Sequence, residues 1–535
     1  MTARSQGNPF YLEELLNYIH EHGVDPQDSS ALRGLELPES LHSLILSRVD
    51  TLGEAPRRTL KVASVVGRTF LAGALPAIYP ELGSPDDIGE HLATLRSRDL
   101  ITLDREDEQS YLFKHVVTQE VAYESMPFAI RAMLHERTGG YIEETGADAI
   151  ELQLDLLAHH FWHSENLEKK REYLVRAGEA AEASYANTAA IDYLERAAPL
   201  VSEQERVDVL LRLGRVVAHV GDWRRAEQVE REALANAELL GDTRSRGWCE
   251  TELAEVARKQ GRYEEAVSLL EQAADAFESV GDDGGLGQVQ HLQGTLEAQQ
   301  GNYLQAVSHY EASLAIRERL GDKSGMAALY SNLGVIAEYR GNPRASREYH
   351  EQALGLRAQI DDRRAIAVSM TNLGTIAVLE HEYEEARDCF EDAMRLNREV
   401  GDAWMVAISD NNLGNATRGL GDYEAAQRHY GESLRAYRDY DDKWALAFLV
   451  EDIGQLAALR GEPECAFELI GAADALREEI GTPRGPGLDE ELERQLGPAR
   501  ALLGAVADLA RARGKALPPE DVFDLALRAC GQTPE

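Results

Sequence analysis

A turn recurs in this chain every twenty residues and keeps its spacing from residue 221 to residue 481. Between these turns the sequence alternates between two kinds of helix, so the true repeat is forty residues long. A fixed period of this length is typical of a solenoid of stacked helical hairpins, which presents extended surface rather than a catalytic pocket. The turn positions hold small or turn-forming residues, with His381 as the odd one: Gly221, Gly241, Gly261, Gly281, Gly301, Gly321, Gly341, Asp361, Gly401, Gly421, Asp441, Gly461 and Gly481.

Alignment on the forty-residue period produces repeated columns, each with a physical reason. A Gly or Ala where helices cross lets two backbones approach closely, and Gly at the turn supplies the left-handed conformation. An aromatic residue or Pro after the turn fills the gap between neighbouring hairpins. The columns are a Leu-Gly pair (as in Leu213-Gly214 and Leu333-Gly334), the aromatic position (Trp223, Tyr263, Tyr303, Pro343, Tyr383, Tyr423, Pro463) and two small positions (Ala226 to Ala466 and Ala233 to Ala473).

This order of Leu-Gly, Gly-x-Tyr, Ala and Ala resembles the tetratricopeptide repeat, in the lengthened forty-residue form seen in some signalling proteins. Seven copies stand in register from about residue 206 to residue 480, and an earlier copy surrounds Gly178 and Ala190. The resemblance implies a right-handed superhelix of about eight helical hairpins.

Three successive copies carry an asparagine directly before the Leu-Gly pair, at Asn332, Asn372 and Asn412. In the repeat family this position lines the concave groove, and an amide both donates and accepts hydrogen bonds, so a row of amides suits the backbone of an extended peptide. The column resembles the asparagine ladders of kinesin light chain and O-linked N-acetylglucosamine transferase. The alternative is that each Asn pairs with a neighbouring helix. The flanking copies hold Arg212, Glu252, Leu292 and Asp452, which confines a ladder to the middle of the array.

The charge balance bounds the partners of the chain. Its 535 residues hold 94 acidic and 55 basic side chains, a formal net charge of -39. Such an excess repels nucleic acid and anionic lipid and favours a protein or peptide partner, with a basic one as the natural complement. The four cysteines are far apart and form no Cys-x-x-Cys pair, and no signal peptide or membrane-spanning stretch is recognisable, so we expect a cytoplasmic protein.

The segment before the repeats lacks the forty-residue period and has a different pattern of apolar residues. Helices are predicted from Leu41 to Leu52, over residues 55–66 and over residues 86–98, followed by short strands at 100–103 and 111–113 and another helix near His115. Three helices followed by a hairpin is the plan of a winged helix. We therefore expect a mostly all-α chain, in which a small winged-helix module precedes the repeat superhelix.

Short motifs in this segment widen the resemblance. They resemble the downstream half of a STAND-type signalling ATPase, in which a P-loop module is followed by a winged helix and tetratricopeptide repeats, often beside a nucleotide cyclase or a transcription module. The motifs are residues 7–15 (GNPFYLEEL), 37–41 (LPESL), 113–115 (FKH), 119–123 (QEVAY) and 157–160 (LAHH).

One departure from that family is decisive for activity. Pro9 would be the adenine-side residue, but the sequence holds no Gly-x-x-x-x-Gly-Lys-Ser/Thr motif to cradle phosphates. The prediction is a chain that is not an enzyme, with no cofactor-binding residues and no cofactor. The alternative is the regulatory half of an ATPase or nucleotide cyclase whose catalytic module lies upstream.

A second alternative, a transcriptional regulator, is disfavoured by charge. Residues 38–145 hold 17 acidic and 11 basic side chains, and the turn of the expected wing holds Asp104, Glu106, Asp107 and Glu108 against Arg105 alone. Because DNA binding depends on basic side chains that displace counterions, this surface predicts no contact with nucleic acid.

Residue types that can bind metals cluster at two kinds of place in the sequence. His159 and His163 lie one helical turn apart beside His160, a two-point arrangement without the Glu of a His-Glu-x-x-His motif, so we interpret them as structural and predict no metal. The paired aspartates at turns such as Asp282-Asp283 lack the distant Glu of an EF-hand, and they are interpreted as helix N-caps.

The sequence thus predicts five regions. These are a remnant of the ATPase helical region at 1–36, a winged-helix-like domain at 37–145, a helical linker at 146–168, the repeats at 169–480 and a helical C-terminal cap at 481–535. The predicted function is that of a non-enzymatic interaction and sensing scaffold in signal transduction. It would bind a peptide or protein in the concave repeat groove.

Overall fold

The computed structural model of the chain describes residues 15–16, 18–19, 40–440, 443–480, 484 and 486–533. The chain forms two compact units, Met1–Arg262 and Tyr263–Glu535, hereafter the first and second units. The predicted ATPase remnant, including Pro9, lies outside the described residues except for residues 15–16 and 18–19, which are helical.

The first unit begins with a small α/β region that contains the predicted helices and hairpin. It also contains a short strand, β1, and a short helix, α6, that the sequence did not reveal, because three and five residues are too few to show a hydrophobic period. The strands form one antiparallel sheet in the order β1-β3-β2. The elements are α4 (Leu41–Asp50), α5 (Glu54–Val66), β1 (Thr69–Leu71), α6 (Ala74–Ile78), η1 (Pro80–Leu82), α7 (Pro85–Ser97), β2 (Ile101–Arg105), β3 (Ser110–Phe113) and α8 (Val116–Glu124).

Local signals fix where these helices start. Ser40 and Ser84 each accept a hydrogen bond from the backbone N–H three residues on, in capping boxes that begin α4 and α7. The Asp87 carboxylate accepts the return bonds from Ser84, and these hydrogen bonds lower its pKa. Sheet and helices enclose one core, in which Ile45, Leu60 and Phe113 are fully buried.

Helix α9 (Phe128–Thr145), the short η2 (Ala147–Gln153) and α10 (Leu154–Trp162) connect this region to eight successive helix pairs. We call the first helix of each pair the A helix and the second the B helix. The A helices are α11 (Leu167–Ala183), α13 (Glu203–His219), α15 (Thr243–Lys259), α17 (Asp283–Gln299), α19 (Lys323–Tyr339), α21 (Arg363–Leu379), α23 (Ala403–Gly419) and α25 (Lys443–Leu459). The B helices are α12 (Asn187–Ala197), α14 (Trp223–Leu240), α16 (Tyr263–Val280), α18 (Tyr303–Leu320), α20 (Pro343–Gln359), α22 (Tyr383–Glu399), α24 (Tyr423–Tyr440) and α26 (Pro463–Glu479).

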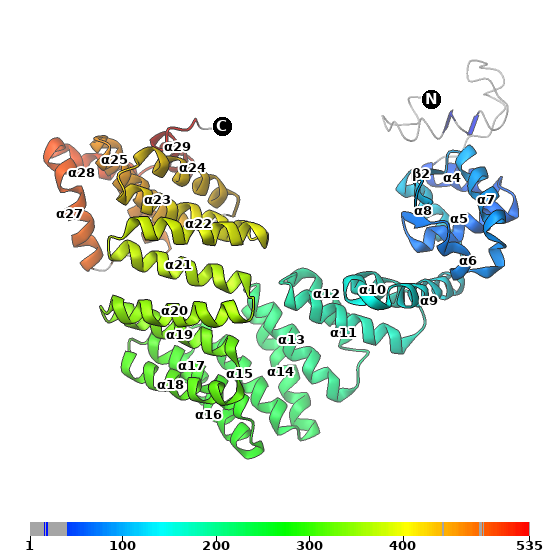
Figure 1. Cartoon of the computed structure of the whole chain (residues 1–535), viewed down its shortest axis with the longest axis horizontal. Helices are drawn as coiled ribbons and strands as arrows, with labels where there is room; N and C mark the ends of the chain where they lie inside the picture. The colour runs from blue at the N-terminus through cyan, green and yellow to red at the C-terminus, as the bar shows by residue number, and fades with distance from the viewer. Residues whose placement is uncertain are drawn as a thin grey trace. The chain divides into compact units, whose positions relative to one another are not determined.

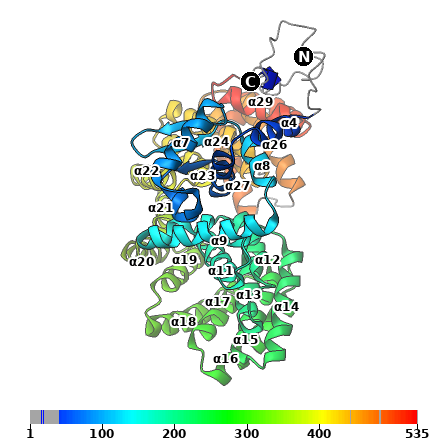
Figure 2. The same cartoon turned by 90° about the vertical axis from the view of Figure 1, so that its right-hand side faces the viewer.

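Within each unit these helices stack in chain order, as Figures 1 and 2 show. The division between the two units falls at the turn between α15 and α16, inside a forty-residue repeat. The nearly all-helical fold with a solenoid of repeats agrees with the sequence prediction.

The twenty-residue turn is a left-handed backbone position. Every turn glycine of the described register has a positive φ, for example 84° at Gly221 and 79° at Gly461. Asp361 and His381 adopt the same conformation, with φ of 53° and 63°, although side chains disfavour it. The aspartate after the turn caps the next A helix, as in the bond from Gly285 N–H to Asp282 Oδ1 of 3.0 Å, so the predicted N-caps are confirmed at Asp282 and Asp362, whereas Asp441-Asp442 lies outside the described residues.

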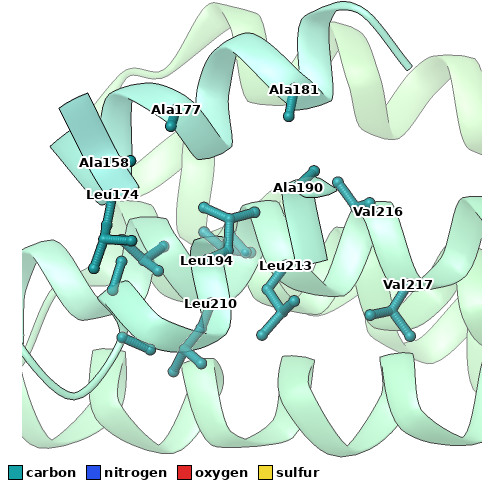
Figure 3. Packing of buried hydrophobic residues seen from close by; sticks show 14 of the residues in the cluster. Ala158, Leu174, Ala177, Ala181, Ala190, Leu194, Leu210, Leu213, Val216 and Val217 are labelled. Atoms are coloured by element: carbon teal, nitrogen blue, oxygen red, sulfur yellow. The ribbon is translucent and has the colours of Figure 1, made fainter. Parts of the chain in front are cut away.

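Small residues between the helices form the packed core. Both small columns are fully buried along the array, from Ala226 and Ala233 to Ala466 and Ala473. In the first unit, Ala177, Ala190 and Leu194 meet between α11, α12 and α13, where alanines let the backbones approach (Figure 3). Burial of these apolar side chains, at about 25 cal/mol per Å², is the main force that joins one hairpin to the next.

The glycine of each Leu-Gly pair faces a large side chain sixteen residues later on the B helix. A Cβ atom on Gly374 would lie 2.5 Å from the ring of Phe390, and one on Gly414 would lie 2.2 Å from the ring of Tyr430. The same column holds Leu194, Glu230, Leu270, Tyr310, His350 and Ile470. Two of its members, Glu230 and His350, are polar yet buried, and the sequence prediction did not single out this column.

Three helices follow the repeats in the second unit and pack on α24, α25 and α26. They are α27 (Pro486–Leu503), α28 (Val506–Lys515) and α29 (Pro519–Ala529). Among the described residues, no helix combines the length and the apolar character that crossing a membrane requires.

Candidate functional site

Within each unit the A helices lie on the side opposite to the B helices. Several neighbouring A helices contact each other, as α11 does α13, α13 does α15, α21 does α23 and α23 does α25. Side chains that point away from the B helices therefore line a surface of each unit. We call this surface the A-helix face.

In the first unit the A-helix face is hollowed at two adjoining places. One hollow of about 400 Å³ lies between α11 and α13, and a second of about 440 Å³ lies across α11, α13 and α15. Glu179, Asp208 and Arg212 line both hollows. Such volumes suit a few side chains of a bound segment.

Charged side chains of opposite sign line these hollows and pair with each other. Arg212 contacts Glu179 at 3.0 Å and Glu182 at 2.7 Å, which ties α13 to α11. Arg215 reaches Glu252 of α15 at 3.8 Å. Because these side chains are only partly buried, each pair adds little stability, about 0–1 kcal/mol. Their main effect is to present alternating charge along the face.

Two carboxyl groups, Glu230 beneath this face and Glu252 lining the second hollow, have raised pKa values. Glu230 of α14 is 1% exposed, and neither of its carboxylate oxygens has a hydrogen-bond partner. Burial first, and the neighbouring Glu252 second, raise the pKa of Glu230 well above its ordinary value. Burial also raises the pKa of Glu252 to about 7. The forty-residue alignment contained the signal, since the residues at the equivalent position in the adjacent copies are Leu194 and Leu270.

In the second unit the same face carries the asparagine column. The Asn332 amide donates to His291 Nε2 of α17 at 2.9 Å, and the Asn372 amide lies 3.5 Å from His350 Nδ1 of α20. The half-buried Asn412 amide has no hydrogen-bond partner among the described residues. Each of the two paired amides therefore contacts a neighbouring helix, whereas Asn412 leaves its donor and acceptor free for a bound molecule.

Several positions next to the asparagines on their helices are uncharged, whereas Asn415, three residues after Asn412, donates to Asp452 of α25 at 3.2 Å, and Asp452 pairs with Arg418. Ala328, Val368 and Ile408 stand four residues before each Asn, on the same helical face, and are half-buried. Val335 and Thr375 stand three residues after and are exposed. The middle of the array thus offers amides among small apolar side chains, a surface unlike the charged face of the first unit.

His350 lies beneath this part of the face and is 1% exposed. Burial, and then the nearby Arg357 guanidinium, lower the pKa of its imidazole to about 4. It is the polar counterpart of Phe390 and Tyr430 in the column that packs on the repeat glycines.

The cysteines offer no activated nucleophile among the described residues. All four are free, and Cys249 and Cys530 are buried. Burial raises the pKa of Cys465 to about 11 and that of Cys530 to about 12, and it raises the pKa of Cys249 and Cys389 as well. A reactive thiol needs a lowered pKa, so these thiols are inert.

The histidines predicted to be structural do not stand alone. His159 and His160 on α10 and His163 at its C-cap lie against His135 of α9, whose ring stacks on His163 with 4.9 Å between centroids. His135 could not be recognised from the sequence, because it is 24 residues from His159 and belongs to another helix.

Comparison with protein families bears on the repeats directly. Residues 245–319 and 325–399 match one tetratricopeptide repeat model, and residues 407–439 match another. These segments are tetratricopeptide repeats. They include the asparagine column, and proteins built from such repeats are interaction scaffolds.

One curated relative matches part of the chain. An uncharacterized protein of Rhizobium meliloti (strain 1021) is 25% identical over 208 residues, which is 38% of this chain but only 20% of that protein. The chain therefore spans about a fifth of the relative it matches.

Solved structures that align with this chain are also low in sequence identity. A STAND protein with a tetratricopeptide repeat sensor from Pyrococcus horikoshii aligns with 98% of this chain and 71% of its own, at 15% identity and a TM-score of 0.48. A Rap protein complexed with competence and sporulation factor aligns with 62% of this chain and all of its own, at 17% identity and a TM-score of 0.39.

Proposed function

We propose that this chain is a non-enzymatic sensing module of a signal-transduction regulator, and that it binds a peptide or protein segment along its A-helix face. The observation that carries the proposal is the asparagine column. Asn332, Asn372 and Asn412 occupy one position of three successive A helices. The half-buried Asn412 amide is not hydrogen-bonded to a described residue.

The chemistry of this face favours an extended segment. Amides spaced by one repeat suit the regularly spaced N–H and C=O groups of a peptide backbone, and the small apolar neighbours leave room for its side chains. The net charge of -39 favours a segment that carries Lys or Arg.

The α/β region of the first unit has an internal role in this proposal, as a winged-helix-like module that transmits a signal rather than a reader of nucleic acid. Its hairpin turn is acidic, and Arg105 is already paired with Glu108 at 2.6 Å. Sensing would operate by population shift, since a ligand that prefers one conformation of a regulator draws the equilibrium toward it. We place the module in the cytoplasm, where four free thiols remain reduced.

The experiment selects linear peptides from a random displayed library on the full-length chain and measures the affinity of the recovered peptide. The triple variant Asn332→Ala, Asn372→Ala, Asn412→Ala is expected to bind at least about tenfold more weakly, since about 1.4 kcal/mol corresponds to tenfold. The control variant Gln352→Ala, Gln359→Ala removes two exposed amides from B helix α20 of the same unit, and it should bind normally.

Two results would contradict the proposal. One is an equal affinity for the triple variant and the wild type, with both folded as judged by circular dichroism. The other is a peptide that protects B helices rather than α19, α21 and α23 from hydrogen exchange.

A further inference from the structure

Four imidazoles from two helices meet in the first unit, away from the A-helix face. His135 projects from α9, His159 and His160 project from α10, and His163 is the C-cap of α10. Their ring centroids are close, at 4.7 Å for His159–His163 and 5.2 Å for His135–His160. One potential ligand nitrogen from each of His135, His159 and His163 lies within 4.8 Å of the others.

We propose that His135, His159 and His163 form a binding site for a divalent transition metal, with zinc as the best fit. Three imidazole nitrogens and no carboxylate are ligands for borderline metals such as zinc, not for magnesium or calcium. The fourth position of a tetrahedral zinc would remain open to water or to an anion. This inference is independent of the proposed peptide-binding function.

The hydrogen bonds of the cluster already orient two of the ligands. The Nδ1–H of His163 donates to the carbonyl oxygen of His159 at 2.8 Å, which leaves its Nε2 lone pair available. His135 Nε2 lies 3.0 Å from the hydroxyl of Tyr123, so a proton on that nitrogen leaves the Nδ1 lone pair to accept from His160 or to bind a metal. Metal-binding histidines usually donate their second ring N–H in this way, and the partner fixes the tautomer.

The fourth histidine supplies an independent sign that the cluster is incomplete. His160 is 1% exposed and its Nε2 has no hydrogen-bond partner. Its Nδ1 lies 3.0 Å from His135 Nδ1, so in the metal-free protein the two rings share one proton. When His135 Nδ1 binds a metal, the His160 N–H loses this acceptor.

Burial and charge around the cluster keep the ligands neutral. Burial and the neighbouring imidazoles lower the pKa of His135 to about 2 and that of His160 to about 3, and they lower the pKa of His159. Arg131 and Arg196 add positive charge nearby. Since these cations oppose a bare dication, an anionic fourth ligand such as hydroxide or chloride fits the site best.

Small movements suffice for coordination. Zinc–nitrogen bonds of about 2.1 Å place tetrahedral ligands roughly 3.4 Å apart, so nitrogens that now lie up to 4.8 Å apart must approach by up to about 1.4 Å. His135 is buried, whereas His159 is exposed and His163 is half-buried. The His159 ring therefore has the most room to turn toward the other two, and the exposed side gives the ion a path in.

A metal here would join α9 to α10, the two longer helices that connect the α/β region to the repeats. The α10 helix continues this link, because Phe161 stacks on Tyr173 of α11 with 5.2 Å between ring centroids. Zinc would thus stiffen the connection between the proposed signalling module and the repeat array.

The test uses untagged full-length protein, dialysed against a chelator and titrated with Co²⁺, a spectroscopic substitute for zinc. We expect one Co²⁺ per chain with the intense visible absorption of four-coordinate cobalt, which zinc then displaces. At a hundredfold excess of free zinc over its Kd, the thermal midpoint should rise by roughly 5–10 °C.

Variants distinguish specific binding at the histidine cluster from non-specific metal binding elsewhere on the protein. His159→Ala removes an exposed ligand without touching the core, and together with His163→Ala it should weaken binding by about a hundredfold or more. His219→Ala, at an exposed histidine of the same unit outside the cluster, should leave binding unchanged. Metal binding that His159→Ala and His163→Ala both retain, or six-coordinate cobalt in the wild type, would overturn the proposal.

Discussion

The A-helix faces of the two units differ in chemistry although the hairpins beneath them use the same columns. In the first unit Arg212 and Arg215 pair with glutamates of neighbouring A helices, whereas in the second unit Asn332, Asn372 and Asn412 stand among small uncharged side chains. The buried small columns are alike in both units. The columns between helices fix the backbone, so the face can vary without loss of the fold.

The same contrast appears in one buried position. Glu230 in the first unit and His350 in the second pack on a repeat glycine, where other copies place Leu, Tyr, Phe or Ile. One group is an acid with a raised pKa, and the other is a base with a lowered pKa. Because the two groups titrate in opposite directions, a change of pH should alter the stability of each unit separately. Hydrogen exchange resolved by peptide is the suitable measurement, because a chain of this size does not unfold in one step.

The largest expected effect is the acid sensitivity of the second unit. His350 has a pKa of about 4 when folded against 6.5 for an ordinary imidazole, so between these values the unfolded chain binds more protons. Stability contributed by the neutral ring is present above pH 6.5 and is lost as the pH falls, by about 2 kcal/mol between pH 7 and 5. The variant His350→Phe should remove this loss in α19 and α20, as read by hydrogen exchange at both pH values. Equal pH slopes for variant and wild type would show that His350 is not the titrating group.

The next effect is in the first unit and has the opposite pH dependence. Glu230 has a raised pKa when folded, so its stability contribution is complete below the ordinary Glu pKa of 4.5 and is lost as the pH rises. Replacement by Leu, as in adjacent copies, should stabilise α13 and α14 by about 1–3 kcal/mol at pH 7.5 and by less at pH 5. The exchange of α21 and α22 serves as an internal control. A destabilised variant at pH 7.5 would mean that the carboxylate has a partner it needs.

A third prediction tests the close packing behind the second face. A methyl group on Gly414 would collide with the buried ring of Tyr430, so Gly414→Ala should cost about 2 kcal/mol. Gly355→Ala, in the same unit, has no atom within 4 Å of the new methyl group and lies within α20, so it should be neutral or stabilise by up to about 1 kcal/mol. Chemical denaturation of the two variants checks the difference in sign. If both behave alike, the helix contact is looser than the structure shows.

The smallest effect concerns the one histidine in the turn register. His381 has a φ of 63°, which glycine adopts without strain, so His381→Gly should stabilise α21 and α22 by about 0.5–1 kcal/mol. Its ring bonds to the Tyr383 hydroxyl at 2.8 Å, and loss of that bond offsets part of the gain. Gly401→Ala, at the next turn, places a side chain on a backbone with a φ of 74° and should destabilise the second unit. A lower thermal midpoint for His381→Gly would show that the hydrogen bond outweighs the backbone strain.

Much of the fold was predictable because each repeat carries the same turn, capping and packing residues at the same positions. The turn glycines, the aspartate caps and the buried small columns follow from local backbone geometry and helix periodicity, and the structure has them where predicted. The three helices and the hairpin before the repeats were predicted from capping residues and alternation. β1 and α6 were missed because they are short.

The candidate sites were harder to predict from the sequence than the fold. The asparagine column was visible, but only the structure shows that Asn332 and Asn372 contact histidines of neighbouring helices while Asn412 does not. The predictions for Pro9 and for the region 1–36 concern residues outside those described, and the predicted domain boundaries remain predictions.

The sequence by itself determined the periodic architecture, since each turn and each small column acts over a few residues and is repeated. Only the tertiary structure brought His135 to His159 and His163, and Glu230 to Arg215 and Glu252, because these contacts join helices whose separation in sequence carries no period. Local rules act within a helix or a turn, and the chemistry of a buried cluster depends on which helices meet.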